Sequence, residues 1–271
     1  NTFFDRVLWV AGDNTRQSYI KLHKPEQDAY IRNLLSLDDE RTSKDLLEVI
    51  LQRKGMLLKI TSETQQVVML SGSSELQEIT EKLTAVRKKL ASLTLAGPTD
   101  ENREQFGKMV YDLEEKVNNY QLELGKQSVR FRESTRKIQI EDVLAGLDES
   151  ALVDFLTYRK KDDSLALLAV VANQEGLNVV QYEDLEMIQA IIMELREIIQ
   201  DEGAEDEDVK SVAYDLWEIL WSPLNEYIGE TESIFISPDS VLNVLPFDAL
   251  TDEEDSYLLE NYDLKIISSA R

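Results

Sequence analysis

Two neighbouring segments place apolar residues at heptad spacing, and this repeat constrains the fold more than any other feature of the sequence. In residues 74–96 the apolar positions follow one another at intervals of 3-4-3-4-3, and in residues 106–124 at 4-3-4-3-4. Such spacing puts the apolar side chains on one stripe of an α-helix. The positions are Leu76, Ile79, Leu83, Val86, Leu90 and Leu93, then Phe106, Val110, Leu113, Val117, Tyr120 and Leu124, with Phe131 extending the second stripe.

The Gly97-Pro98 pair between the stripes predicts a reversal of the chain, because glycine caps a helix and proline cannot continue it. We expect the second helix to begin near Thr99 or Asp100. Two striped helices joined by a short loop predict an antiparallel coiled-coil hairpin. An ordinary helical bundle that buries the same faces would give the same pattern, and both interpretations stay open.

The chain before the hairpin is also expected to be helical. Phe3, Phe4, Val7, Leu8 and Val10 suggest a helical end, residues 29–37 a short helix, and residues from 43 onward a longer one. The last of these carries Leu46, Ile50, Leu57 and Ile60 on one face, and Ser71-Gly72-Ser73 interrupts it. This first part reads as the end of a larger helical region.

The apolar period changes after residue 138. Short apolar runs at 151–158 and 164–172 and an alternating run at 176–182 predict strands, with a hairpin turn at 173–176. A helical stripe follows (Leu185, Ile188, Ile192, Leu195, Ile199), then an acidic loop at 203–208 and a helix stopped by Pro223. Further strands are expected at 233–236, 241–245 and 262–267.

The resulting division has three parts. We predict the end of an upstream helical region at 1–43, a helical coiled-coil hairpin arm at 44–138, and an α+β or α/β layered sheet at 139–271. The sheet is expected to be incomplete, because the chain stops at Arg271 immediately after a predicted strand.

Composition excludes several classes of function. The net charge of −24 disfavours a nucleic-acid surface, and the acids are interspersed with Lys and Arg as on solvated helix faces. The absence of cysteine removes disulfides, thiolate metal sites and a cysteine nucleophile from this chain. The longest apolar stretch, residues 165–172, is far shorter than a membrane span, and a cytoplasmic protein without membrane contact is expected.

For each of the isolated motifs we favour a structural interpretation over a functional one. His23, the single histidine, precedes Pro25 and is expected in an exposed loop. The acidic run 205–208 lacks the spaced oxygens and turn glycine of a calcium loop and is expected to be a solvated loop. Residues 125–128 resemble a phosphate loop only superficially, because they lie inside a heptad helix.

Two further candidates lie near the end of the chain. Asp239 and Asn243 could line a groove at the strand ends, although turn chemistry explains them more simply and makes Leu242, Leu245, Phe247 and Leu250 core residues. Trp217 and Trp221 could anchor a partner, although burial against the sheet is preferred. We therefore assign no catalytic, cofactor-binding or metal-ligating residue.

Three stretches, taken in order, resemble the start of a CHAT domain. They are the helical lead-in at 49–58, the helix pair with its Leu95-Ala96-Gly97-Pro98 break, and a series of motifs near the end. In that series a helix carrying Trp221-Ser222-Pro223-Leu224 precedes a strand ending in Pro238-Asp239. The segment 242–250, with sequence LNVLPFDAL, and a strand closing on Ser269-Ala270-Arg271 then follow.

The CHAT family consists of caspase-like relatives of clan CD cysteine peptidases and is often preceded by tetratricopeptide repeats. The resemblance implies a caspase-like α/β fold and a His–Cys dyad that lies downstream of Arg271, so that this chain alone would be inactive. It also implies a protein substrate and the remainder of the same polypeptide as a partner, with no cofactor. The tetratricopeptide consensus is not evident in residues 1–36.

Two other hypotheses remain open. The chain could be a non-catalytic scaffold or protein-interaction module with a degenerate caspase-like domain, in which the helical arm performs assembly. Alternatively, Arg271 could be a processing site and the chain a matured fragment.

Overall fold

The computed structural model describes residues 13–37, 39, 41–54, 74–99, 102–132, 140–201 and 203–270. Its internal contacts divide the chain into two units. Residues 1–24 and 56–137 form one, called here the hairpin unit, and residues 25–55 and 138–271 form the other, the sheet unit. Residues 56–137 thus interrupt the sheet unit in sequence. The three-part division drawn from the sequence stays a prediction.

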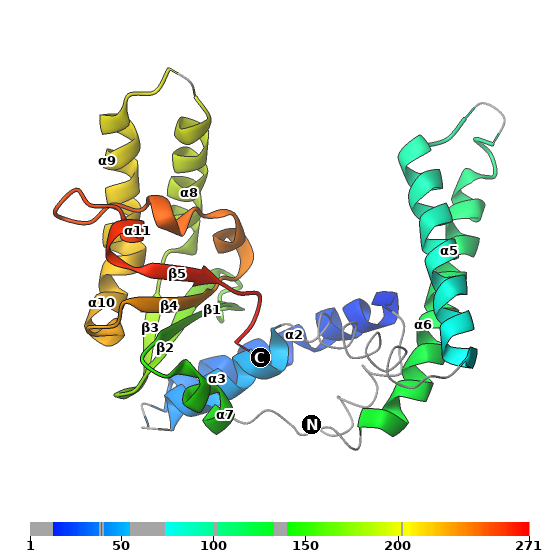
Figure 1. Cartoon of the computed structure of the whole chain (residues 1–271), viewed down its shortest axis with the longest axis horizontal. Helices are drawn as coiled ribbons and strands as arrows, with labels where there is room; N and C mark the ends of the chain where they lie inside the picture. Colours follow the sequence, from blue (N-terminus) through cyan, green and yellow to red (C-terminus); the bar gives the residue numbers. More distant parts are fainter. Residues whose placement is uncertain are drawn as a thin grey trace. The chain divides into compact units, whose positions relative to one another are not determined.

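The hairpin unit is built on the two striped helices, α5 (Ser74–Ala96) and α6 (Phe106–Arg132), which pack against each other (Figure 1). Leu76, Ile79 and Leu83 of α5 are buried with Leu124 of α6, and Val117 and Tyr120 pack against them. All heptad positions along α5 are buried or half-buried while most of its other residues are exposed, so the predicted helical hairpin is confirmed. Supercoiling of the pair stays a prediction.

The turn of the hairpin differs in length from the prediction. Gly97 adopts a left-handed conformation (φ 69°) and its N–H bonds to the Leu93 carbonyl, which ends α5 as the Gly-Pro pair predicts. However, α6 begins at Phe106 rather than near Thr99, because residues 102–105 form a separate turn. Thr99 N–H donates to the side chain of Asn102 at 2.8 Å, which favours that turn over an immediate helix.

Helix α2 (Asp13–Leu35) is longer than the short helix expected at residues 29–37. It contains Pro25, and His23 lies half-buried within it, so the prediction of an exposed loop histidine was wrong. Proline disfavours helix interiors because it lacks an N–H, yet the helix continues through it. Helix α3 (Thr42–Arg53) follows, as the stripe predicted. Leu57, Ile60 and the apolar residues of segment 1–12 lie outside the described residues.

Five strands form the sheet of the second unit. They are β1 (Ala151–Arg159), β2 (Leu165–Asn173), β3 (Gly176–Tyr182), β4 (Ser233–Ser237) and β5 (Asp263–Ile266), in the spatial order β3-β2-β1-β4-β5. The first three strands pair antiparallel as consecutive hairpins, whereas β4 is parallel to β1 and β5 is parallel to β4. The structure therefore confirms the predicted α+β fold with a mixed sheet.

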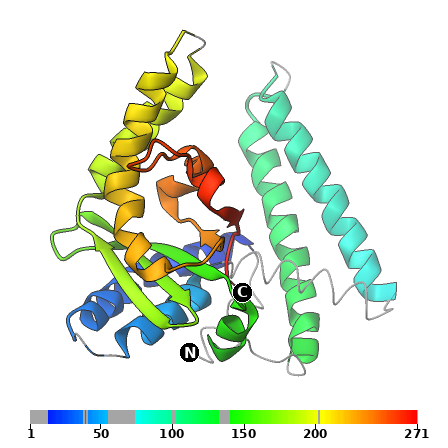
Figure 2. The same cartoon turned by 60° about the vertical axis from the view of Figure 1, so that its left-hand side comes forward.

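Helices cover both faces of this sheet (Figures 1 and 2). The even-numbered residues of β1, such as Leu152 and Leu156, face α3, the C-terminal half of α2 and α7 (Ile140–Leu147). The odd-numbered ones, such as Val153 and Phe155, face α8 (Leu185–Gln200), α9 (Asp206–Leu216) and α10 (Ser222–Ile228). Burial on both faces explains why β1 and β2 are nearly continuous apolar runs.

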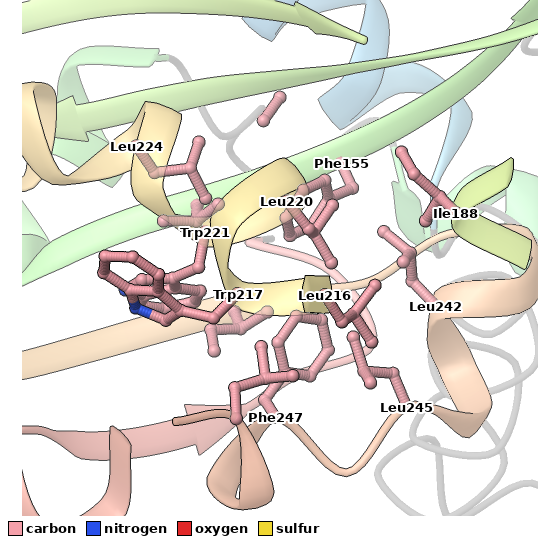
Figure 3. Packing of buried hydrophobic residues seen from close by; sticks show 14 of the residues in the cluster. Phe155, Ile188, Leu216, Trp217, Leu220, Trp221, Leu224, Leu242, Leu245 and Phe247 are labelled. Carbon is pink, nitrogen blue, oxygen red and sulfur yellow. The ribbon is translucent and has the colours of Figure 1, made fainter. Parts of the chain in front are cut away.

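The core on the α8 side contains a group of aromatic side chains among its aliphatic ones (Figure 3). The rings of Phe155 and Phe247 stack at 6.0 Å, and Trp221 meets Phe247 edge-on at 6.3 Å. Trp217 is 5% exposed and Trp221 is fully buried, which confirms the predicted burial against the sheet. Leu242, Leu245, Phe247 and Leu250 are likewise core residues, as predicted.

Pro223 does not stop the preceding helix, contrary to the prediction. After α9, a turn of π-helix, η1 (Trp217–Trp221), leads directly into α10, where Pro223 is the second residue. Proline is accepted there because the first N–H groups of a helix need no intrahelical partner. The hydroxyl of buried Tyr182 donates to the carbonyl of Leu220 at 2.7 Å, which satisfies a carbonyl of the widened turn.

Two other expectations near these helices were also wrong. Residues 241–245 were expected to be a strand, but residues 240–244 form a 3-10 helix, η2 (Ser240–Val244), and η3 (Phe247–Ala249) follows. Of the expected acidic loop, Asp206, Glu207 and Asp208 instead make the first turn of α9, where negative charge favours the helix N-terminus.

Helix α8 gives a direct test of the core. Replacing fully buried Ile192 with alanine should lower the free energy of unfolding by about 2–5 kcal/mol, because it leaves a cavity between α8 and the sheet. The neighbouring Met193→Ala change, at a side chain that is 49% exposed, should stay within about 0.5 kcal/mol. Urea unfolding of the two variants measures the difference, and similar losses would contradict the described packing.

Candidate functional site

The sheet reverses its order of assembly between β1 and β4. From β1 the chain adds β2 and β3 on one side, and then returns to place β4 and β5 on the other. Because β1 and β4 are parallel, their carboxyl ends point the same way, and open sheets commonly bind ligands at such a place. Two fully buried polar side chains, Asp154 and Ser237, lie where β4 ends beside β1.

Strand β1 extends beyond its parallel neighbour. Ser237, the last residue of β4, pairs with Asp154, whereas β1 continues to Arg159. Past the end of β4, the side chain of Asp239 bonds to the backbone of β1. Its Oδ2 accepts the backbone N–H of Thr157 at 2.7 Å, and its Oδ1 accepts the backbone N–H of Ser240 at 2.9 Å. One carboxylate thus satisfies an amide of the central strand and also caps η2.

This geometry supports the turn interpretation of Asp239 and Asn243. The Nδ2 of Asn243 donates to the carbonyl of Ser240 at 2.9 Å, and Ser240 has a positive φ of 52°. The side chains of Asp239 and Asn243 therefore stabilise a turn of the backbone directly after β4, where the strand does not continue. Neither side chain bonds to the three buried polar residues Lys54, Asp154 and Ser237 that lie near the end of β4.

The buried polar cluster consists of Lys54, Asp154 and Ser237. Lys54 Nζ lies 2.7 Å from Asp154 Oδ1, 2.8 Å from the Ser237 carbonyl and 2.9 Å from Ser237 Oγ. Asp154 and Ser237 are fully buried, and only 9% of the Lys54 side chain is exposed. Lys54 is the residue that follows α3, so the cluster joins a helix end to two strands.

The electrostatics of the cluster follow from burial. Loss of water raises the pKa of the Asp154 carboxyl, while the Lys54 charge and its hydrogen bond act in the opposite direction. The carboxylate of Asp239 adds to the upward shift in the pKa of Asp154. Asp154 Oδ2 is buried and accepts no hydrogen bond from the described part of the chain, so Lys54 carries the main compensation for this carboxylate.

The cluster is not arranged as a serine–lysine hydrolase site. A lysine ammonium has three hydrogens, and Lys54 Nζ donates to Asp154 Oδ1 and to both oxygens of Ser237. Groups of the fold itself therefore take up all three contacts of Nζ. The hydroxyl of Ser237 is also fully buried, so no substrate can reach it. The arrangement is structural.

Sequence reasoning missed all three members. One signal was available: Asp154 is the single acid in the apolar run 151–158, and a carboxylate buried in a central strand needs a cationic partner. Nothing in the sequence identified that partner, because Lys54 lies 100 residues earlier at the end of an ordinary amphipathic helix.

The remaining sequence candidates do not assemble into a site. Asp206, Glu207 and Asp208 are exposed on α9, and no group of three metal-ligating side chains occurs in the described ranges. Residues 125–128 continue α6 and form no loop. His23 belongs to the hairpin unit, whereas the buried polar cluster belongs to the sheet unit.

A buried pair predicts a characteristic mutational pattern. Lys54→Met or Asp154→Leu alone should cost about 3–5 kcal/mol in free energy of unfolding, because each leaves an uncompensated buried charge. The double variant Lys54→Met/Asp154→Leu should recover most of that loss, because an apolar pair replaces the ions.

Lys44→Met provides the matched control, since Lys44 lies on the same helix, α3, and its ion pair with Glu141 of α7 is exposed and should contribute little to stability. A double-mutant cycle by denaturant unfolding measures the coupling. Additive losses at residues 54 and 154 would show that the two side chains do not compensate each other.

Among the residues that the structure describes, none of the helices combines the length and hydropathy that crossing a bilayer requires.

Comparison with known proteins identifies the final quarter of the chain. The CHAT domain family model matches residues 210–271, a range that begins within α9 and includes α10, β4, β5 and the residues after β5. No curated protein matches the chain. Of the three stretches noted in the sequence, the third falls within this range: Pro238-Asp239 directly follows β4, and residues 242–250 include the end of η2 and all of η3. Residues 210–271 therefore match the CHAT domain, as the resemblance indicated for this part of the chain.

Proposed function

We propose that this chain supplies the opening part of a CHAT-family, caspase-like cysteine endopeptidase. The observation that carries the proposal is the CHAT match over residues 210–271, which includes both strands that extend the sheet past β1. The catalytic His and Cys that the family resemblance implies would follow Arg271 in the complete protein. The substrate would be a protein, and the location cytoplasmic.

The chemistry of the chain itself supports this division of labour. With no cysteine in its sequence, the chain has no thiol to attack a peptide carbonyl. Its single histidine, His23, belongs to the hairpin unit. The sheet unit would therefore provide the scaffold on which the catalytic strands are added.

The free edge of the sheet supports the place of that addition. Each parallel strand is added outward, β4 beside β1 and β5 beside β4. Among the residues described, no strand pairs with the outer edge of β5, and Ile266 on this strand is 56% exposed. An unpaired edge with exposed apolar residues is a template for a further strand, here one from the remainder of the same polypeptide.

The alternative is a non-catalytic interaction module. It is favoured by the α5–α6 hairpin, which has its own buried seam and belongs to a unit separate from the sheet. In this case the hairpin would bind a partner protein and the CHAT sheet would be degenerate. The excess of negative charge disfavours nucleic acid as a partner under either proposal.

The edge of β5 allows a sharp test in the complete protein. The N–H groups of Asp263 and Ile267 bond back to β4, so the N–H of Ile266 points to the free edge. Ile266→Pro removes that outward donor and should abolish labelling by a cysteine-directed peptidyl ketone, together with cleavage of a protein substrate. Ile266→Ala, the matched control, should keep both.

Replacing the downstream nucleophile with alanine should remove labelling completely. Labelling of Ile266→Pro at the level of Ile266→Ala would exclude β5 as the strand that receives the catalytic half. A complete protein that no probe labels, and that binds partners only while α5 and α6 are intact, would favour the interaction module.

A further inference from the structure

We propose that Lys54 is a positioning residue that fixes the carboxyl end of β4, and with it residues 267–270, to the point where the chain leaves the sheet unit. The hairpin unit would act on the CHAT sheet through this residue. This consequence for regulation rests on the proposed peptidase function, whereas the positioning role does not.

Lys54 lies at the end of α3, next to the boundary of the sheet unit. Its backbone N–H bonds to the Ile50 carbonyl at 2.8 Å, so it is held to the end of α3 although its own conformation is extended. The sheet unit ends one residue later, at residue 55, and resumes at residue 138. The chain therefore passes between the two units at three places, within α2 at residues 24–25, just after Lys54 and just before α7. Lys54 is the buried polar side chain next to the second of these junctions.

The ammonium group of Lys54 binds residues of two strands, β1 and β4. Lys54 Nζ bonds to Asp154 on the central strand and to both the carbonyl and the hydroxyl of Ser237. The two bonds to Ser237 fix the last residue of β4, main chain and side chain together. Beyond this residue β4 has no ladder, and Asp239 must support the backbone instead.

The end of β4 is in turn bonded to the segment that follows β5. The N–H of Ile267 bonds to the Ile236 carbonyl at 2.8 Å, one residue before Ser237. Ile267 and Ala270 pack against the same core cluster as α3, and Ser269 Oγ lies 3.5 Å from the Lys54 carbonyl. Lys54 thus contacts β4 through its side chain and the segment 267–270 through its main chain.

A charged residue is suited to this role because its bonds are directional. Apolar side chains at residues 54 and 154 could hold α3 against the sheet equally well, since burial has no preferred direction. Apolar side chains would not fix the position of Ser237, at the end of β4, relative to the end of α3. Buried ion pairs can specify one arrangement in this way even where they add little stability.

Under the proposed function, residues 267–270 lead from β5 toward the catalytic residues. A partner that reorients the hairpin unit would then alter the order of this segment through Lys54. The regulation would need no contact between the partner and the peptidase site.

Native-state hydrogen exchange of the complete chain separates positioning from stability. Lys54→Met/Asp154→Leu should unfold at a urea concentration close to that of the wild type, while the Ile267 amide exchanges at least about tenfold faster. The Leu168 amide, in the β1–β2 ladder, should keep its wild-type rate. Lys44→Met, on the same helix, should leave both rates unchanged.

Two results would overturn the proposal. One is a wild-type exchange rate at Ile267 in the double variant, and the other is an equal acceleration at Ile267 and Leu168. Lys54→Met alone is not needed for the conclusion, so failure of that variant to fold leaves the test intact. The readout involves no peptidase activity, and a protein without such activity would still pass or fail it.

Discussion

The sheet of this protein buries one carboxylate in its central strand, and the arrangement around it follows from the need to compensate that charge. Asp154 lies on the α3 side of β1 among side chains such as Leu152 and Leu156, where an unpaired ion is not tolerated. Lys54, at the end of α3, forms the ion pair that compensates this charge. The same ammonium group also binds the carbonyl of Ser237 at the end of β4. The ion pair therefore brings together three elements that are far apart in sequence.

Local patterns predicted the elements of the fold where one physical signal dominated. The stripes of α5 and α6 and the stripe of α8 were found because their apolar periods are uninterrupted. The strand bounds were close because β1 and β2 are buried on both faces and β3 follows a hairpin turn. In that turn Asn173 Oδ1 accepts the N–H groups of Glu175 and Gly176, as the turn residues suggested.

The sequence was misleading where tertiary contacts override a local signal. Pro223 looked like a stop, but a π-turn lets it enter α10 at a position that needs no N–H. Residues 241–245 were expected to be a strand, yet Asp239 caps residues 240–244 as a 3-10 helix and also binds the backbone of β1. The buried polar cluster could be anticipated only at Asp154, because no local pattern relates it to Lys54 or Ser237. The CHAT motifs near the end of the chain, by contrast, were recognisable from the sequence, and the family match over residues 210–271 includes them. The stretches at 49–58 and 95–98 lie outside that match and stay predictions.

The interruption of the sheet unit by residues 56–137 has a consequence for biosynthesis. A ribosome that adds about 5–20 residues per second completes Lys54 several seconds before Asp154, which lies 100 residues later. During that interval the apolar face of α3, including Leu46, Leu47 and Ile50, has no strand to cover it. The α5–α6 hairpin can fold meanwhile from contacts close in sequence. The nascent chain is thus expected to need protection at α3, a transient client site for chaperones that the finished protein no longer displays.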